Sequence, residues 1–434
     1  MQACFINVCR AYGLLENYVS TSLPLVHIDQ LQTGMFVSLD MGWLEHPFLV
    51  NSFLIKNDKQ LATLRELGLH MVAYDPHRSE TQPHPLEVEP DEPKAPQVTP
   101  ENQRLIDEKH VRIGRMAAHR DRVILLGKQY EESIGTAKDV LTGILRDPQL
   151  AAAQATAMSE QLTSTFLDDQ GATVMMVAAQ KMDDITHQHA LNVMILTMVI
   201  CKGLGVSREI MNAAGVGALL HDIGKSSISK TVLRKWPRNR AEETLYRLHC
   251  EYGLKLVGEY VNPGVRAVIR QHHECFDGSG FPEGIKGAQI NPLARIVAIA
   301  DRYDTLCNPL RLADALPPAE ALSTMFAREA KRFDPAILSV FIRELGVYPP
   351  GSFVQLSNGS IGLVIAATAG STLKPTVMVY EPGVPRREAV VINLTESSEV
   401  KVDCVLKPSA LQQEVIEYLN PRMRLSYYAQ KAGV

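Results

Sequence analysis

The stretch AAGVGALLHDIGK, residues 213–225, decides how the middle of this chain folds. Its apolar and small residues recur at helical spacing and end at a histidine that is followed directly by an aspartate. Gly224 then frees the chain to turn. The sequence therefore predicts an apolar helix whose end presents His221 and Asp222 side by side, where both side chains can converge on one metal ion.

Two further stretches supply side chains of the same kinds. RQHHECFDGSGFP, residues 270–282, places His272 and His273 at a helix end, before a glycine-rich turn. ARIVAIADRYD, residues 294–304, carries Asp301 on a third predicted helix. Imidazole and carboxylate groups thus gather at the ends or on the faces of several helices.

Two isolated histidines extend the set. His189 and His249 each lie on a predicted helix of their own. Taken alone, a histidine on an apolar helix face is more often a hydrogen-bonded core or surface residue than a ligand. The ordered series H, HD, H, HH and D within one helical region favours a metal site. His187 faces elsewhere on the helix of His189, so we expect it to face solvent or to support the site from outside.

The mixture of ligands restricts the metal. Imidazole and carboxylate together suit iron, manganese, cobalt, nickel or zinc better than calcium or magnesium. The candidates are too many for one tetrahedral ion, so we expect two ions bridged by Asp222. One ion takes His189, His221 and Asp301, and the other takes His249, His272 and His273. Two ions roughly 3.5–4 Å apart form the clamp that phosphate-ester hydrolases use for in-line displacement.

The rest of the chain divides around this region, which we expect to be an all-α domain over residues 104–344. Residues 1–76 mix strand patterns with one short helix, for which Asn57 is the expected N-cap, and predict a small α+β accessory domain. Residues 77–103 combine prolines with acidic side chains and predict an extended linker. Residues 345–434 contain an Asn-Gly hairpin signal and predict a β-rich extension with a final helix. The fold class is therefore multidomain.

Composition excludes several classes of protein. The chain has 434 residues, of which 46% are apolar and 21% charged, and its formal net charge is −4. This charge argues against a polyanion-binding surface, so we expect no DNA or RNA partner. Seven scattered cysteines indicate neither a disulfide framework nor a zinc ribbon. Because we find no signal-peptide pattern and no membrane-span pattern, we expect a cytoplasmic protein.

The residues at 221–225, 272–282 and 294–304 resemble the HD-GYP branch of the HD-domain phosphohydrolases, over roughly residues 180–310. The N-terminal region is similar to an uncharacterised module found ahead of some bacterial HD-GYP domains. The resemblance implies a metal-dependent phosphodiesterase that hydrolyses cyclic di-GMP to 5′-pGpG, and often onward to GMP, in bacterial second-messenger signalling. It implies two divalent transition-metal ions, iron or manganese first, with zinc, nickel or cobalt as alternatives.

The resemblance also implies roles for single residues. Asp222 and Lys225 are the expected catalytic residues, and the Lys225 ammonium would contact the substrate phosphate; the alternative is a surface lysine at a helix end. Arg311 is the one cation in CNPLRLAD, residues 307–314, where the family usually has a more basic stretch, and it is the second candidate for a substrate contact. The expected motif loop contains Asp277, Gly278, Gly280, Phe281 and Pro282.

Two further departures from the family pattern shape the expectations. Phe281 stands where the family has the tyrosine of GYP, so a hydrogen bond from that hydroxyl is absent. Ile185 stands where some relatives carry a glutamate for a third metal, so we expect two ions. The alternatives are a phosphohydrolase of another cyclic dinucleotide or nucleotide, and a non-hydrolysing nucleotide-binding regulatory protein. Signalling-protein partners, and a homodimer formed through helices of residues 105–180, also stay open.

Overall fold

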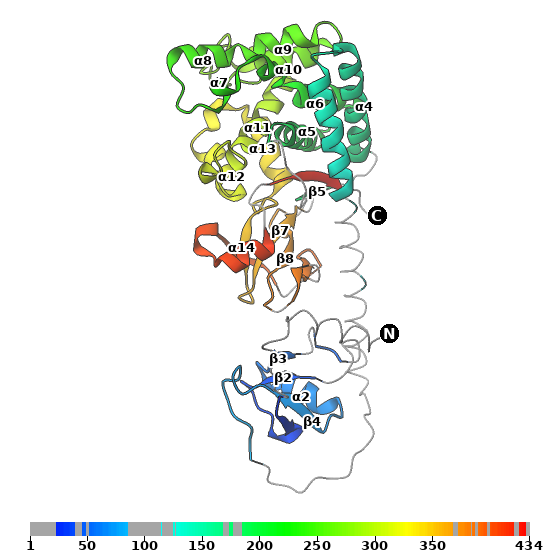
Figure 1. Cartoon of the computed structure of the whole chain (residues 1–434), viewed down its shortest axis with the longest axis vertical. Coiled ribbons are helices and arrows are strands. Elements are labelled where there is room, and N and C mark those ends of the chain that lie inside the picture. The colour runs from blue at the N-terminus through cyan, green and yellow to red at the C-terminus, as the bar shows by residue number, and fades with distance from the viewer. Residues whose placement is uncertain are drawn as a thin grey trace, which may run out of the picture. The chain divides into compact units, whose positions relative to one another are not determined.

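The computed structural model describes residues 23–39, 46–48, 52–85, 114, 125, 127–167, 173–176, 185–367, 372–382, 384–386, 389–396, 400–420 and 425–430. Two compact units divide the chain, Met1–Ala118 and His119–Val434. The first contains a small α+β domain, and the second contains a helical domain and the C-terminal strands (Figure 1). The expected multidomain fold class is confirmed.

The first unit is built on a four-stranded antiparallel sheet with the strand order β1-β4-β2-β3. Its elements are β1 Leu25–His27, β2 Phe36–Ser38, β3 Ser52–Leu54, α2 Asp58–Glu66 and β4 Met71–Tyr74. Asn57 caps α2 by accepting a hydrogen bond from the backbone N–H of Gln60 at 3.0 Å, as the sequence predicts. The core of this unit includes Met35, Val37 and Leu64, which are fully buried.

The described residues 77–85 also belong to this unit, although the sequence predicts a linker from residue 77. The backbone N–H of Glu80 donates to Gly34 O at 2.7 Å, and that of His84 donates to Gln30 O at 2.9 Å. These bonds join residues about fifty positions apart, so proline content and charge cannot reveal them. The rest of the predicted linker lies outside the described residues.

Helices around one apolar core make up most of the second unit. The central helix is α5, Ile185–Leu204, which is buried along most of its length, as an apolar helix without a polar face should be. α6 and α11 pack directly on it. The helices besides α5 are the helical residues 127–143, α4 Pro148–Leu167, α6 Arg208–Leu220, α7 Lys230–Arg234, α8 Arg240–Arg247, α9 His249–Val257, α10 Pro263–Gln271, α11 Pro292–Cys307, α12 Pro318–Ala327 and α13 Pro335–Leu345, with the 3₁₀ turn η2 Ile223–Ser227.

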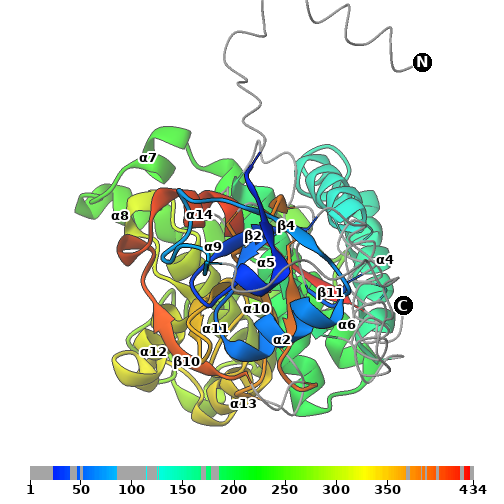
Figure 2. The same ribbon diagram turned by 90° about the horizontal axis from the view of Figure 1, so that it is seen from below.

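α4 lies at one side of the helical domain (Figure 2). It packs against α5 and α6 through buried residues such as Ala155 and Phe166. The described helices of residues 105–180 therefore bury apolar faces within their own domain. No helix among the described residues combines the length and apolar character needed to cross a membrane.

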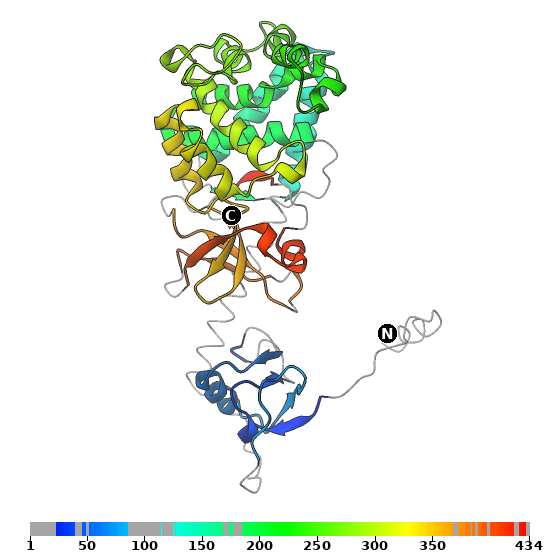
Figure 3. The same ribbon diagram turned by 90° about the vertical axis from the view of Figure 1, so that its left-hand side faces the viewer.

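Six C-terminal strands and β5, Thr173–Met176, form a seven-stranded sheet beside the helices (Figure 3). Strands β10, β6, β7, β5 and β11 follow one another, while β8 pairs with β7 and β9. The bounds are β6 Phe353–Leu356, β7 Ile361–Ala366, β8 Thr376–Val379, β9 Val391–Asn393, β10 Val402–Leu406, α14 Gln413–Leu419 and β11 Tyr427–Gln430. The predicted hairpin turn joins β6 to β7, and its Gly359 has the left-handed φ of +83°.

One strand contradicts the expectation of an all-helical middle. β5, Thr173–Met176, lies between α4 and α5 in the sequence and pairs with β7 and β11 of the C-terminal sheet. Four residues are too few for alternation to identify a strand, and both partner strands lie much later in the chain. The helical domain and the extension therefore share one sheet.

Candidate metal centre

The end of α6 carries the histidine–aspartate pair. His221 is the C-terminal cap of α6, and Asp222 precedes η2. Gly224 lies so close to the start of α9 that a Cβ on it would come within 1.9 Å of His249 O. Because only glycine admits this approach, Gly224 places the turn after Asp222 directly against His249.

The motif loop follows α10 and is closed by its own backbone contacts. A Cβ on Gly280 would lie 2.3 Å from Cys275 N, so the two arms of the loop approach as closely as glycine permits. One carboxylate oxygen of Glu274 accepts the backbone N–H groups of Glu283 at 2.7 Å and Gly284 at 3.1 Å. These bonds fix the loop on the residues that follow the paired histidines.

Within this loop, Phe281 contacts the centre and Asp277 does not. The Phe281 ring stacks on His273 with centroids 4.6 Å apart. Asp277 is exposed and accepts hydrogen bonds from the backbone N–H and the hydroxyl of Ser279, and the next residue, Gly278, has φ of +84°. Asp277 therefore forms the turn of the loop.

The structure brings all seven candidate ligands together in two groups. We call His189, His221 and Asp301 the first ligand group, and His249, His272 and His273 the second ligand group. Asp222 lies between them. Its Oδ2 is 3.4 Å from His221 Nε2 and 3.9 Å from His189 Nε2, whereas its Oδ1 is 3.5 Å from His249 Nε2 and 3.6 Å from His272 Nε2. One carboxylate therefore faces both groups, as a bridging ligand must.

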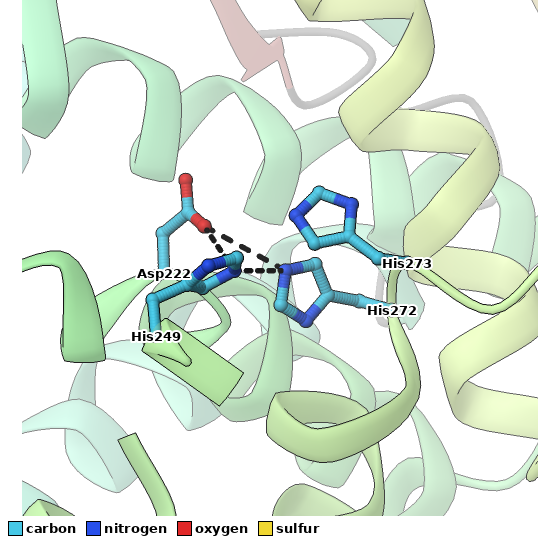
Figure 4. Close-up of side chains that lie close together, drawn as sticks. All are labelled: Asp222, His249, His272 and His273. Carbon is cyan, nitrogen blue, oxygen red and sulfur yellow. Dashed lines mark hydrogen bonds and ion pairs between the residues drawn. The ribbon is translucent and has the colours of Figure 1, made fainter. Parts of the chain in front are cut away.

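Hydrogen bonds to backbone fix the rings of His249 and His272, whose nitrogens lie beside each other and beside Asp222 (Figure 4). His249 Nδ1 donates to Tyr246 O at 2.7 Å, and His272 Nδ1 donates to Ile269 O at 3.1 Å. Both Nε2 atoms therefore carry lone pairs, and these two atoms lie only 3.3 Å apart. Other buried acceptors without a hydrogen-bond partner are His221 Nε2, Asp222 Oδ1 and His273 Nε2. Imidazole nitrogens that converge on a shared carboxylate fit divalent cations.

Two family models match the chain. The first is described as an HD domain and covers residues 172–337, which include every candidate ligand. These residues of the chain are therefore similar to the HD-domain family. The second is described as a domain of unknown function (DUF3391), covers residues 25–155, and thus runs across the predicted linker into helical residues. The resemblance drawn from the motifs is confirmed.

Curated relatives match this chain over different shares of its length. A cyclic di-GMP phosphodiesterase from Pseudomonas aeruginosa is 28% identical over 82% of this chain and 85% of its own length. A cyclic di-GMP phosphodiesterase response regulator from Xanthomonas campestris pv. campestris is 32% identical over 33% of this chain and 39% of its own. A 3′3′-cGAMP-specific phosphodiesterase from Vibrio cholerae is 29% identical, over 44% and 47%. This chain therefore spans less than half of the last two proteins.

One solved structure is similar to this chain. An HDG"Y"P protein from Bdellovibrio bacteriovorus matches with a TM-score of 0.42 and 15% sequence identity. The match covers 73% of this chain and 97% of that one.

The surroundings of Asp222 and of the histidines in the HD domain shift the pKa values of these groups. Burial alone raises the pKa of Asp222, but the charges of Lys225 and His221 outweigh it and hold the pKa well below the usual range. Burial lowers the pKa of His249 to about 3 and also lowers that of His273. An ionised Asp222 beside neutral His249 and His273 is the protonation state that metal binding requires at the second ligand group. At His189 burial lowers the pKa, but the hydrogen bonds and charges of Asp301 and Asp304 outweigh it and raise the pKa to about 10.

Lys225 lies in the centre, whereas Arg311 does not contact it. Lys225 Nζ forms an ion pair with Asp222 Oδ2 and lies 5.4 Å from the ring centroid of Tyr246. Its side chain is 24% exposed, which disfavours the surface-lysine alternative. Arg311 lies in the loop after α11 with its side chain 60% exposed, and its guanidinium pairs with Asp314 at 2.7 Å.

The structure also tests the expectations for two residues near the start of α5, His187 and Ile185. His187 is only 8% exposed, so the expectation that it faces solvent is wrong and the alternative of support from outside the ligand groups remains. Ile185 begins α5 and is 38% exposed. Its apolar side chain offers no ligand atom to a metal.

Sequence reasoning missed the residues that hold His189. Asp304 is fully buried, and its Oδ2 accepts a hydrogen bond from His189 Nδ1 at 2.7 Å. Its other oxygen accepts from the side-chain amides of Asn192 and Asn308, each at 2.8 Å. The sequence could have indicated Asp304 as part of the site, because it follows Asp301 by three positions and therefore lies on the same face of the helix.

Proposed function

We propose that this chain is a metal-dependent phosphodiesterase that hydrolyses cyclic di-GMP to 5′-pGpG. The observation that carries the proposal is the convergence of acceptor atoms from both ligand groups on the two oxygens of Asp222. Such a cluster is stabilised by cations, and paired cations suit phosphate-ester hydrolysis. The names of the relatives support a cyclic dinucleotide as the substrate.

In this proposal two divalent ions, iron or manganese, occupy the centre. The first ligand group holds one ion, the second ligand group holds the other, and Asp222 bridges them. Soft thiolate ligands are absent from both groups, and the mixture of imidazole and carboxylate suits these metals. When bound, the ions supply Lewis acidity, which lowers the pKa of water and neutralises charge on the phosphate.

Residues outside the two ligand groups position the substrate. Lys225 is held beside Asp222, where its ammonium neutralises negative charge on a phosphate oxygen as that charge increases in the transition state. Phe281 covers the His273 ring and keeps water from that face of the centre. Arg311 is the weaker candidate for a phosphate contact, because Asp314 already neutralises it.

The choice of cyclic di-GMP rests on the extent of similarity. The Pseudomonas aeruginosa cyclic di-GMP phosphodiesterase matches this chain over most of both lengths, whereas the 3′3′-cGAMP-specific relative matches over less than half. Phe281 can stack on a base or a ribose but cannot donate a hydrogen bond. We therefore expect discrimination between guanine and adenine to come from groups other than this ring.

The test is single-turnover hydrolysis by the full chain loaded anaerobically with Fe²⁺ or with Mn²⁺. Cyclic di-GMP, 3′3′-cGAMP and cyclic di-AMP are compared at equal enzyme and metal content, and 5′-pGpG and GMP are separated by chromatography. We expect the fastest cleavage for cyclic di-GMP, and none in Asp222→Asn. A metal-loaded protein that binds but does not cleave any of the three would support the regulatory alternative and overturn the proposal.

A further inference from the structure

Three residues near the C-terminus are buried against the helices that carry the first ligand group. Leu425, Ser426 and Tyr427 are 4%, 1% and 0% exposed. They contact α5, which carries His189, and α11, which carries Asp301. We call Leu425–Tyr427 the C-terminal segment.

Two asparagines join this segment to the centre, and each uses its whole side-chain amide to do so. The Nδ2 groups of Asn192 and Asn308 both donate to Asp304 Oδ1 at 2.8 Å and to Leu425 O at 3.0 Å. Their oxygens accept backbone N–H groups of the C-terminal segment, Asn308 from Leu425 at 2.9 Å and Asn192 from Tyr427 at 3.3 Å.

This arrangement leaves each amide one orientation in which all its hydrogen bonds are made. The nitrogen faces the Asp304 carboxylate and the Leu425 carbonyl, while the oxygen faces a backbone N–H of the C-terminal segment. Asn192 is fully buried and Asn308 nearly so. Without the segment, both amides would lose acceptor and donor partners where water cannot replace them, and Asp304 would lose its fixed donors.

Asp304 in turn fixes the orientation of His189, a candidate metal ligand. Its Oδ2 accepts a hydrogen bond from His189 Nδ1 at 2.7 Å, which fixes the ring and makes Nε2 the nitrogen that can face a metal. His189 Nε2 then lies 3.2 Å from Asp301 Oδ1, within the first ligand group. A ring held by a buried carboxylate binds metal more tightly than a ring free to rotate.

We propose that the C-terminal segment is a positioning part of the metal centre, because it fixes Asn192 and Asn308, and through them Asp304 and the ring of His189. The inference rests on the proposed function in one respect, that His189 binds metal. The segment continues into β11, whose Tyr427 pairs with Met176 of β5. Displacement of this end of the C-terminal sheet therefore weakens metal binding at the first ligand group.

Mn²⁺ titration of the full chain by calorimetry tests the inference without any substrate. In Asn192→Leu and Asn308→Leu, which keep side-chain volume and remove the amide, we expect one Mn²⁺ to bind about 10–100-fold more weakly while the other keeps its affinity. Leu419→Ala is the matched control, because Leu419 is fully buried in α14 and makes none of these bonds. Leu419 belongs to the same apolar core as Leu425 and Tyr427, so this variant loosens the packing around the C-terminal segment without removing an amide hydrogen bond. Equal losses in all three variants would overturn the inference.

Hydrogen exchange of the unmodified protein provides a second test that does not depend on variants folding. Coupling is reciprocal, so Mn²⁺ bound at the first ligand group must stabilise the bonds of the C-terminal segment by the same factor. We expect slower exchange at the amides of Leu425 and Tyr427 when Mn²⁺ is added, with no change in β8 and β9. Unchanged exchange at those two amides would overturn the proposal.

The two proposals fail in different ways. If Mn²⁺ protects the C-terminal segment but no cyclic dinucleotide is cleaved, the proposed function fails and the positioning role stands. If cyclic di-GMP is cleaved but neither the affinity nor the exchange responds as expected, the positioning role fails and the proposed function stands.

Discussion

The region around His189 and the region around the other histidines of the metal centre hold their rings in different ways. In the second ligand group, His249 and His272 donate Nδ1 to backbone carbonyls three residues earlier, and His221 does the same with Ala218 O at 2.7 Å. His189 instead donates to a carboxylate that lies 115 residues later in the chain. His221, His249 and His272 are fixed by local backbone, and His189 is fixed by a side chain from a distant part of the sequence.

The difference has a physical consequence. Free carbonyls at a helix end exist wherever the helix stops, so a histidine at that point acquires its orientation from local backbone. A carboxylate such as Asp304 must itself be held, and its holders depend on packing between α5, α11 and the C-terminal segment. We therefore expect the locally held ligands to tolerate distant changes, and His189 to respond to them.

Asp222→Asn is expected to have the largest effect, because Asp222 is the residue that both ligand groups share. The amide keeps the shape, removes the charge and leaves one acceptor atom, so it cannot bridge two cations. We expect both metal affinities to fall and single-turnover hydrolysis of cyclic di-GMP to drop at least ~100-fold. Metal content by elemental analysis and quenched-flow chromatography measure the two effects.

The control for this variant is Asp403→Asn, which makes the same chemical change at an exposed position on β10. Metal content and rate should match the unmodified protein. An Asp222→Asn protein that retained both metals and a near-normal rate would show that the two ligand groups act without a shared carboxylate.

Lys225→Ala is expected to separate catalysis from metal binding. Lys225 pairs with Asp222 but offers no lone pair while it is protonated, and its pKa is raised because the charge of Asp222 outweighs the effect of burial. Loss of one such electrostatic contact costs a rate factor of about 100 or more. Single-turnover rates at matched metal content test this, with Lys225→Arg as the variant that keeps the charge. Equal rates in Lys225→Ala would return this residue to a structural role.

Phe281→Ala is expected to affect only the second ligand group. The ring stacks on His273 and lies 4.8 Å from the Arg247 guanidinium carbon, so its loss frees the His273 ring on one side. We expect about tenfold weaker Mn²⁺ binding at one site, measured by calorimetry. Phe281→Tyr keeps the stack and should bind Mn²⁺ as the unmodified protein does. If Phe281→Ala weakened both sites equally, the two ligand groups would not be independent.

The same contrast explains what the sequence could predict. His221, Asp222, His272 and His273 lie at helix ends beside glycine, so local pattern was enough to place them as candidate ligands. Their roles as ligands stay a prediction until metal is measured. The hairpin at Gly359 and the cap at Asn57 were predicted for the same reason, since each depends on neighbouring residues.

The features that the sequence did not reveal depend on long-range pairing. β5 exists because β7 and β11 pair with it, and Asp304 is buried because Asn192, Asn308 and Leu425 surround it. Asn192 lies inside the apolar helix α5 and could have indicated a buried hydrogen-bond network, because a buried amide needs partners. Its partners, however, could not be identified from spacing on one helix.

Glu329→Gln is expected to have the smallest effect. It tests whether metal binding by the first ligand group depends on every contact that holds α11 in place, or only on the hydrogen bonds around Asp304. Arg302 of α11 binds the Glu329 carboxylate, with its Nε at 2.8 Å. Burial alone raises the pKa of Glu329, but the hydrogen bond and charge of Arg302 outweigh it and lower the pKa overall. The folded-state pKa is therefore below the unfolded one, so this pair stabilises the fold above the unfolded pKa, and the contribution is lost as pH falls through the folded pKa.

We expect Glu329→Gln to lower the unfolding free energy by about 1 kcal/mol or less at pH 7, and the difference from the unmodified protein to vanish on acidification below the pKa of Glu329. Thermal unfolding followed by circular dichroism at several pH values measures this, with Glu251→Gln, at an exposed position on α9, as the control. Mn²⁺ affinity at pH 7 should not change in either variant, because neither touches Asp304 or its amides. A loss of Mn²⁺ affinity in Glu329→Gln comparable to that of Asn308→Leu would mean that general anchoring of α11 positions His189, and the specific role of the asparagines would be wrong.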